Sequence, residues 1–122
     1  MTKRLAGILF IICLLISFCS CGKEVSDYAR EHGQIGLEII EDYLSGNLTA
    51  DSAQSKLSVQ RELIQQHCDK TEADTGKYPH YDSIVAIKIG DCWTAIFGHS
   101  IGSDSKESIK TAANELKKAM NR

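Results

Sequence analysis

Apolar residues recur at steps of three and four along most of this chain, which is the spacing of an amphipathic α-helix. One apolar stripe runs through residues 25–45 and a second runs through residues 53–68. Between them, Gly46 stands where a helix typically ends, and Thr49 stands where the next helix can be capped. Because two helices joined by so short a turn must lie antiparallel, the pattern predicts a helical hairpin.

Two glycines interrupt the first predicted helix. Gly33 and Gly36 each weaken a helix by about 1 kcal/mol relative to alanine, so we expect them where another helix approaches closely. Residues 69–81 are polar, contain the only proline and are predicted to form a loop. A last stripe within residues 109–120 predicts a further helix, whose start is marked by Asp104 and Glu107 because they resemble a capping box.

The segment 83–97 fits two structures. Its many β-branched residues, with Gly90 and Asp91 as a two-residue turn, favour a β-hairpin. Its apolar residues Val85, Ile89 and Ile96 instead recur at helical spacing, and two strands alone form only a marginal sheet. The sequence therefore predicts a mostly α fold, an antiparallel bundle of three to four helices. The alternative is an α+β fold with a hairpin at 83–97 packed on helices.

The first 21 residues follow a different pattern. Lys3 and Arg4 precede an apolar run, residues 5–20, which has 16 residues where a membrane-spanning helix needs about 20. The run closes on a serine immediately before Cys21. This order of charge, apolar core, small residue and cysteine resembles the signal sequence of bacterial lipoproteins, with its lipobox. The resemblance implies that Cys21 receives a diacylglyceryl group with palmitate-type chains and becomes the mature N-terminus.

The match to the lipobox is incomplete, because Phe18 stands where that family usually has leucine. The alternative is an uncleaved signal anchor, oriented by its positively charged start. Either anchor places the residues that follow outside the cytoplasm, at the outer face of a bacterial cell membrane. We therefore expect a signal peptide at residues 1–20, a tether at residues 21–24 and a single small helical domain at residues 25–122.

Size and charge narrow the function classes. The chain has 122 residues and a formal net charge of −2, and removal of the signal peptide with its two cations leaves 102 residues at −4. A mildly acidic chain without a basic tract binds nucleic acid poorly, so we expect no nucleic-acid partner. The expected partners are the membrane, through the lipid anchor, and a protein or another component of the cell envelope.

Processing would leave two cysteines of the original five with an unmodified thiol. Cys13 and Cys19 leave with the signal peptide and Cys21 is alkylated, so Cys68 and Cys92 remain. In an oxidising compartment this pair can form a disulfide. The alternative is two buried free thiols, because an unpaired cysteine packs like a small apolar side chain.

A second resemblance covers most of the remaining chain. The run Asp42-Tyr43-Leu44-Ser45-Gly46, followed by Leu48-Thr49-Ala50-Asp51, is similar to a pattern in small bacterial helical proteins that have no assigned activity. Asp82 and Leu116 continue the resemblance towards the C-terminus. It implies a helix at residues 83–98 and assigns no functional residue.

Few side chains of the chain are suited to chemistry. It has no Gly-rich phosphate loop, no Gly-x-Ser-x-Gly elbow and no His-Glu-x-x-His motif. A scattered set of metal-ligand types matches no standard zinc spacing, so we expect no metal site and no cofactor. Cys68 and His67 point about 100° apart on a helix, so their adjacency does not create an activated nucleophile. The scattered set comprises His32, His67, Cys68, Asp69, His80, Asp82, Cys92 and His99.

The aromatic residues offer one further possibility. Trp93, Tyr78 and Tyr81 could line a recognition surface, although packing in the core or against loops explains them more simply. We therefore expect a lipid-anchored, non-enzymatic binding or interaction module. The alternative is a small metal-binding or thiol-dependent enzyme that uses Cys68, Cys92 and the nearby histidines.

Overall fold

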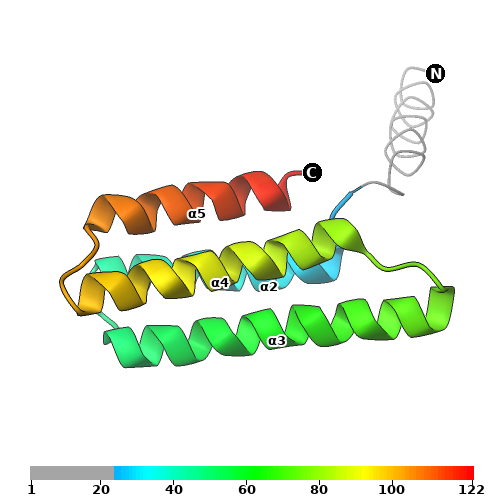
Figure 1. The fold of residues 1–122 in the computed structure, drawn as a ribbon, viewed down its shortest axis with the longest axis horizontal. Helices are drawn as coiled ribbons and strands as arrows, with labels where there is room; N and C mark the ends of the chain where they lie inside the picture. Colours follow the sequence, from blue (N-terminus) through cyan, green and yellow to red (C-terminus); the bar gives the residue numbers. More distant parts are fainter. Residues whose placement is uncertain (1–23) are drawn as a thin grey trace, which may run out of the picture.

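The computed structural model describes residues 24–122. The predicted signal peptide, the predicted lipidation site Cys21 and most of the predicted tether lie outside the described residues. The described part contains four α-helices and no β-strand: α2 (Asp27–Leu44), α3 (Ala50–Thr75), α4 (His80–Ser100) and α5 (Lys106–Met120). Each helix runs antiparallel to the one before it (Figure 1). The predicted mostly α fold, an antiparallel helical bundle, is confirmed.

The predicted hairpin of α2 and α3 is present, and its caps are the expected ones. The side chain of Thr49 accepts a hydrogen bond from the Ser52 backbone N–H at 3.1 Å and so caps α3. Gly46 follows the end of α2 with a φ of +80°, the left-handed conformation that glycine adopts most easily. At its other end, α2 is capped by Ser26, whose Oγ accepts from the Ala29 N–H.

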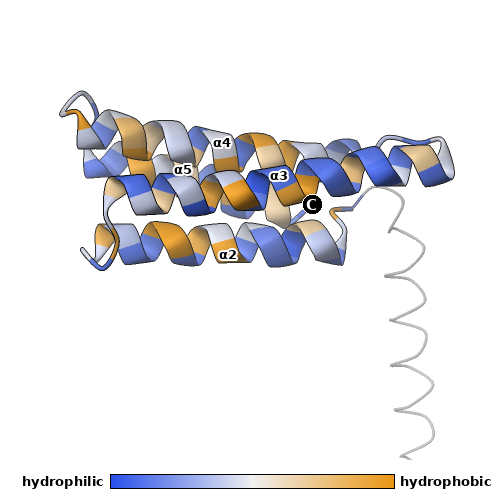
Figure 2. Cartoon of the chain, turned by 90° about the horizontal axis from the view of Figure 1, so that it is seen from below, coloured by the Kyte–Doolittle hydropathy of each residue, from blue (hydrophilic) through white to orange (hydrophobic). Residues whose placement is uncertain are grey.

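The prediction of a loop over residues 69–81 is largely wrong. Helix α3 continues to Thr75, and only residues 76–79 connect it to α4. The last turns are mostly hydrophilic (Figure 2), and α3 projects beyond the start of α4 (Figure 1), so no apolar stripe marks this extension in the sequence. Gly76 ends the helix with a φ of +74°, and its N–H donates to the carbonyl of Glu72.

Segment 83–97 lies within α4, so the alternative with a β-hairpin is wrong. Gly90 and Asp91 occupy the middle of the helix and form no turn. The residues Val85, Ile89 and Ile96, which recur at helical spacing, are completely buried. Burial of this stripe against the other helices outweighs the modest preference of β-branched residues for strands.

Helix α4 is central to the bundle, because it contacts α2, α3 and α5. The two glycines of α2 face this core, as predicted. A Cβ on Gly33 would lie 2.8 Å from the Met120 Sδ and 3.2 Å from a Val85 methyl carbon. Gly36 lies opposite Ile89 and Leu116. Glycine at these positions therefore lets α2 approach α4 and α5 closely.

The start of α5 differs slightly from the prediction. Ser105 occupies the N-cap position and makes no side-chain cap hydrogen bond, so the expected cap at Asp104 is wrong. The Asp104 carboxylate instead packs against Gly98 of α4, where glycine leaves room for it. The backbone N–H groups of Ser103 and Asp104 both donate to the Gly98 carbonyl, at 2.9 and 3.1 Å. These contacts fix the turn between α4 and α5.

Both ends of the described chain lie at the same end of the bundle (Figure 1). The Val25 N–H donates to the Arg122 carbonyl at 3.0 Å, and the Arg30 Nε donates to the Met120 carbonyl at 3.0 Å. We call this the leader-proximal end, and it also holds the connection at residues 76–79. Within residues 24–122, no helix combines the length and the apolar character that crossing a membrane requires.

Candidate functional site

Asp82 is a buried carboxylate at the leader-proximal end. Only 2% of it is exposed, and it lies in the first turn of α4. Both of its oxygens accept hydrogen bonds from Ser26: the backbone N–H reaches Oδ1 at 2.8 Å, and the hydroxyl reaches Oδ2 at 2.6 Å. Because Ser26 also caps α2, these two bonds join the starts of α2 and α4. We call this pair the Ser26–Asp82 clamp.

Two histidines and a tyrosine pack beside the clamp. The His67 Nε2 lies 3.8 Å from the Asp82 Oδ2, and the His67 ring stacks on Tyr28 with centroids 4.3 Å apart. Tyr28 also contacts the His32 ring at 4.4 Å, and the His32 Nδ1 lies 2.6 Å from the Gln60 Oε1. The sequence placed His32, His67 and Asp82 in the candidate set, but nothing in it indicated Ser26 or the stacking tyrosine.

Serine, histidine and aspartate therefore meet here, but not in the order that nucleophilic catalysis requires. In a catalytic triad the histidine lies between the serine and the carboxylate and accepts the serine proton. Here the Ser26 hydroxyl donates directly to Asp82, while its oxygen accepts from the Ala29 N–H. His67 contacts the carboxylate at a longer distance. The arrangement holds helices together and leaves Ser26 without a base.

A cavity of about 350 Å³ opens beside the clamp. Its wall includes Ser26, His67 and Asp82, with Tyr78 and Tyr81 from the chain around the start of α4. The two tyrosines pack against the hydrophobic core while remaining partly exposed. They thus serve mainly as packing residues, the simpler of the two roles expected for them.

The two cysteines are free and completely buried, which is the second of the two arrangements expected from the sequence. Burial, with smaller effects of Asp82 and Asp69, raises the pKa of the Cys68 thiol to about 11. Burial and Asp91 raise the pKa of the Cys92 thiol to about 12. Because the thiolate is the reactive form, neither cysteine is prepared for nucleophilic chemistry near neutral pH.

The remaining residues of the candidate set do not converge. Asp69 and His80 are exposed, and His99 is at the opposite end of α4, where its Nδ1 lies 2.5 Å from the Tyr43 hydroxyl. Among residues 24–122, no group of three or more histidine, cysteine, aspartate or glutamate side chains is arranged to hold a metal ion.

A second feature lies on the outer face of α4. Ile87, Phe97 and Ile101 are large apolar residues with 55%, 44% and 63% of their surface exposed. With Gly90 and Thr94 between them, they follow one another at steps of three or four residues, so the four residues within α4 share one helix face and Ile101 follows them as the C-cap residue. We call these five residues the α4 stripe. The sequence spacing could have identified it only once residues 83–97 were known to be helical.

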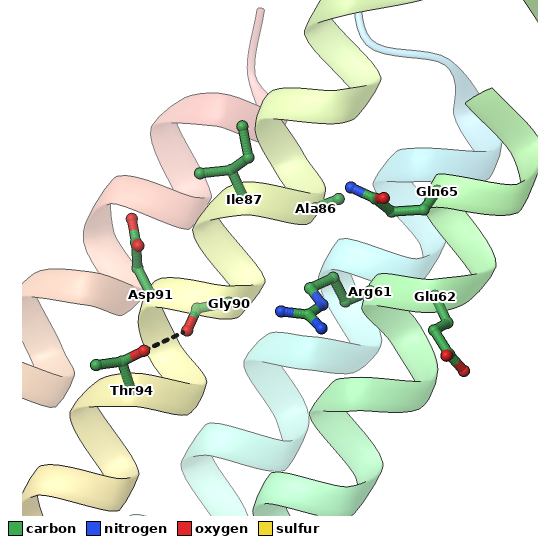
Figure 3. A pocket seen from close by; sticks show the side chains of 8 residues that line it. All are labelled: Arg61, Glu62, Gln65, Ala86, Ile87, Gly90, Asp91 and Thr94. Atoms are coloured by element: carbon green, nitrogen blue, oxygen red, sulfur yellow. Dashed lines mark hydrogen bonds between the residues drawn. The ribbon is translucent and has the colours of Figure 1, made fainter. Parts of the chain in front are cut away.

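The N-terminal part of the α4 stripe, from Ile87 to Thr94, borders a hollow of about 600 Å³ between α3 and α4 (Figure 3). Arg61 and Gln65 extend from α3 towards α4, whereas Glu62 points away from it. Gly90 has no side chain to fill the α4 side of the hollow. A Cβ built on Gly90 would lie 3.5 Å from an Arg61 guanidinium nitrogen. The hollow is open to solvent and combines apolar and charged walls.

The C-terminal part of the α4 stripe contains the exposed residues Phe97 and Ile101. The Phe97 ring stacks on Trp93 with centroids 5.7 Å apart and an interplanar angle of 15°. Trp93 is partly buried and packs against the core, so it supports the exposed phenyl ring from below. Trp93 thus packs at the margin of the core, the simpler of the two roles considered for it from the sequence.

Comparisons of this chain with family models, with curated proteins and with solved structures found no match.

Proposed function

We propose that this chain is a lipid-anchored, extracytoplasmic binding module without enzymatic activity, and that it binds a protein partner through the α4 stripe. The observation that supports this proposal is the alignment of three exposed large apolar side chains, Ile87, Phe97 and Ile101, on one helix face. Single exposed apolar residues are ordinary, but several large apolar side chains on one face beside a hollow are typical of protein–protein contacts.

The chemistry of the leader-proximal end gives less support to the enzyme alternative. Its serine and carboxylate are engaged in joining helices, and both thiols have raised pKa values. The large apolar residues of the α4 stripe, by contrast, keep 44–63% of their surface exposed. A role in binding therefore explains why these apolar residues are exposed and not buried in the bundle.

The anchor is supported by the leader and by the position of the residue that follows it. Glu24 begins the described chain at one end of the bundle, so a tether of residues 21–24 would hold this end near the membrane. Two acyl chains, at about 0.8 kcal/mol per buried methylene, make such an anchor effectively permanent.

The anchor can be tested by counting thiols in protein purified from bacterial membranes. A processed chain alkylated at Cys21 has two reactive thiols in denaturant, Cys68 and Cys92, whereas the unprocessed chain has five. Intact mass and release from membranes in a Cys21→Ser variant provide the control. A membrane-bound chain with five reactive thiols would refute lipidation and favour the signal anchor.

The binding role can be tested by replacing Phe97 in the membrane-anchored protein. We expect Phe97→Ser to remove the crosslinked species that a photoreactive residue at position 101 forms in intact cells. The matched control is Val59→Ser, because Val59 is 51% exposed but lies on the outer side of α3, two residues from the buried Leu57. Crosslinks that survive Phe97→Ser and disappear in Val59→Ser would contradict the proposal.

A further inference from the structure

We infer that the partner of the α4 stripe is a second copy of this chain, and that the two α4 helices meet antiparallel across a twofold axis at Thr94. This inference rests on the proposed binding role of the α4 stripe and names its partner. It comes from self-complementarity: the N-terminal part of the α4 stripe fits the C-terminal part of a second copy. A surface that binds a different protein does not need this property.

The first support is the spacing of the stripe about its centre. Ile87 lies seven residues before Thr94, and Ile101 lies seven residues after it. Gly90 lies four residues before Thr94, and Phe97 lies three residues after it. A twofold axis at Thr94 exchanges positions 87 and 101 and brings Gly90 within one residue, about 1.5 Å along the helix, of Phe97, because a C2 contact pairs residue i with j and j with i. Ile87 then faces Ile101 of the second copy, and Gly90 faces its Phe97.

The second support is shape. The hollow of about 600 Å³ lies at Gly90, towards the N-terminal side of Thr94, and the exposed Phe97 ring, stacked on Trp93, lies on the C-terminal side. Under the twofold operation each exposed phenyl ring meets the hollow of the other copy. Arg61 lies beside Gly90, so its guanidinium can pack on the face of the entering ring as a cation–π contact.

The third support is charge. The charged residues nearest the hollow are Arg61, Glu62 and Asp91, and Lys88 forms an ion pair with Asp91 at 3.8 Å. These four charges sum to zero, so two copies of this face can meet without accumulating charge of one sign. A strongly acidic or basic partner has no complementary charge on this surface to recognise.

The size of the face indicates a weak dimer. Helix α4 has 21 residues and is therefore about 30 Å long, and with the adjoining flank of α3 the face is about 20 Å wide. Each copy would bury about 600 Å², which is near the lower limit for a specific interface. Confinement of both copies to a membrane raises their effective concentration and compensates for a modest affinity.

Antiparallel pairing also determines how the dimer sits on a membrane. Helix α4 begins at the leader-proximal end, so the two leader-proximal ends lie at opposite ends of the dimer. Four residues of extended chain between Cys21 and Val25 reach at most about 14 Å. Both anchors can therefore enter one membrane only if the helix axes lie along its surface.

Disulfide crosslinking of single cysteine variants of the detergent-purified protein tests the register. With a mild added oxidant, Thr94→Cys should form a disulfide-linked dimer, because position 94 meets itself on the axis. Ile87→Cys alone and Ile101→Cys alone should stay monomeric, since equal positions lie about 21 Å apart in the antiparallel pair. An equimolar mixture of these two variants should form the mixed dimer.

Two controls keep the test specific. Val59→Cys, exposed on the outer side of α3, should not crosslink, and the buried Cys68 and Cys92 should not react in the parent protein. Sedimentation equilibrium gives the dissociation constant without a crosslink. We expect Phe97→Ala to raise that constant about tenfold or more, and Val59→Ala to leave it unchanged.

Each result decides between arrangements. Crosslinking of Ile87→Cys with itself indicates a parallel pair and overturns the inference. A parent protein that remains monomeric at every accessible concentration, in solution and in detergent, also overturns it. If such a monomer still gives Phe97-dependent crosslinks to another protein in cells, the proposed binding function stands and only the identity of the partner is wrong. If those crosslinks are absent as well, both proposals fail.

Discussion

Removal of the Ser26–Asp82 clamp should lower the free energy of unfolding more than removal of any other polar contact among the described residues. Asp82→Ala eliminates two hydrogen bonds to a buried carboxylate, of 2.8 and 2.6 Å. Hydrogen bonds to charged groups contribute about 1.5–3 kcal/mol each, and relief of the carboxylate's own desolvation offsets part of the loss. We expect the free energy of unfolding to fall by about 3–4 kcal/mol.

A double-mutant cycle separates the clamp from the helix cap. Ser26→Ala removes the hydroxyl bond and the cap on α2 but leaves the backbone N–H bonded to Asp82, so it should cost about 2 kcal/mol. The double variant should cost about 1–2 kcal/mol less than the sum of the single variants, because the hydroxyl and the carboxylate bond each other.

Urea unfolding followed by circular dichroism measures these differences. Ser100→Ala is the matched control, because the exposed Ser100 hydroxyl donates within its own helix, to the Phe97 carbonyl at 2.7 Å. It should change the free energy of unfolding by less than about 0.5 kcal/mol. An Asp82→Ala cost below about 1 kcal/mol, or a coupling free energy near zero, would refute the clamp as a stabilising contact.

Three further outcomes test other parts of the fold. Gly98→Ala should lower the free energy of unfolding by about 1–2 kcal/mol, since its methyl group would overlap the Asp104 carboxylate; a melting temperature equal to that of the parent would contradict this contact. Gly90→Ala should raise the free energy of unfolding of the monomer by about 0.5–1 kcal/mol, because a Cβ meets only ordinary contacts there and alanine favours helix; a loss in urea unfolding would show that position 90 is not helical. The protein should lose stability as pH rises above about 9, because unfolded thiols ionise near that pH while the pKa values of folded Cys68 and Cys92 are raised to about 11 and 12. A variant with both cysteines replaced by alanine should show a smaller alkaline loss in unfolding experiments at graded pH, and an equal loss would contradict the raised pKa values.

The helices could be predicted from the sequence where each had a single apolar stripe that is buried in the bundle. The stripes around Ile40 and Leu57 are buried as expected, and Gly46 and Thr49 stand at the ends that they indicated. The last turns of α3 could not be found in this way, because they project from the bundle and bury little. Gly76 was the available signal, since glycine commonly follows the end of a helix.

The candidate sites were less predictable than the fold. Asp82 was suspected as a ligand only because of its residue type, and its partner Ser26 lies 56 positions away in the chain. Such a contact depends on how helices pack and leaves no local pattern. The α4 stripe was hidden for another reason: α4 is apolar on several faces, so its buried and exposed apolar residues cannot be separated before its neighbours are known.

The contacts at Val25 and Ser26 also determine how the domain responds to mechanical force. A pull applied through residue 24 first reaches Val25, which is bonded to Arg122 beyond the end of α5, and then Ser26, which is bonded to α4. The force is therefore shared between α2, α4 and the end of α5. Helix α2 cannot unfold turn by turn from its N-terminus until these bonds break. A domain held by its N-terminal end thus resists extraction at the point where the load arrives.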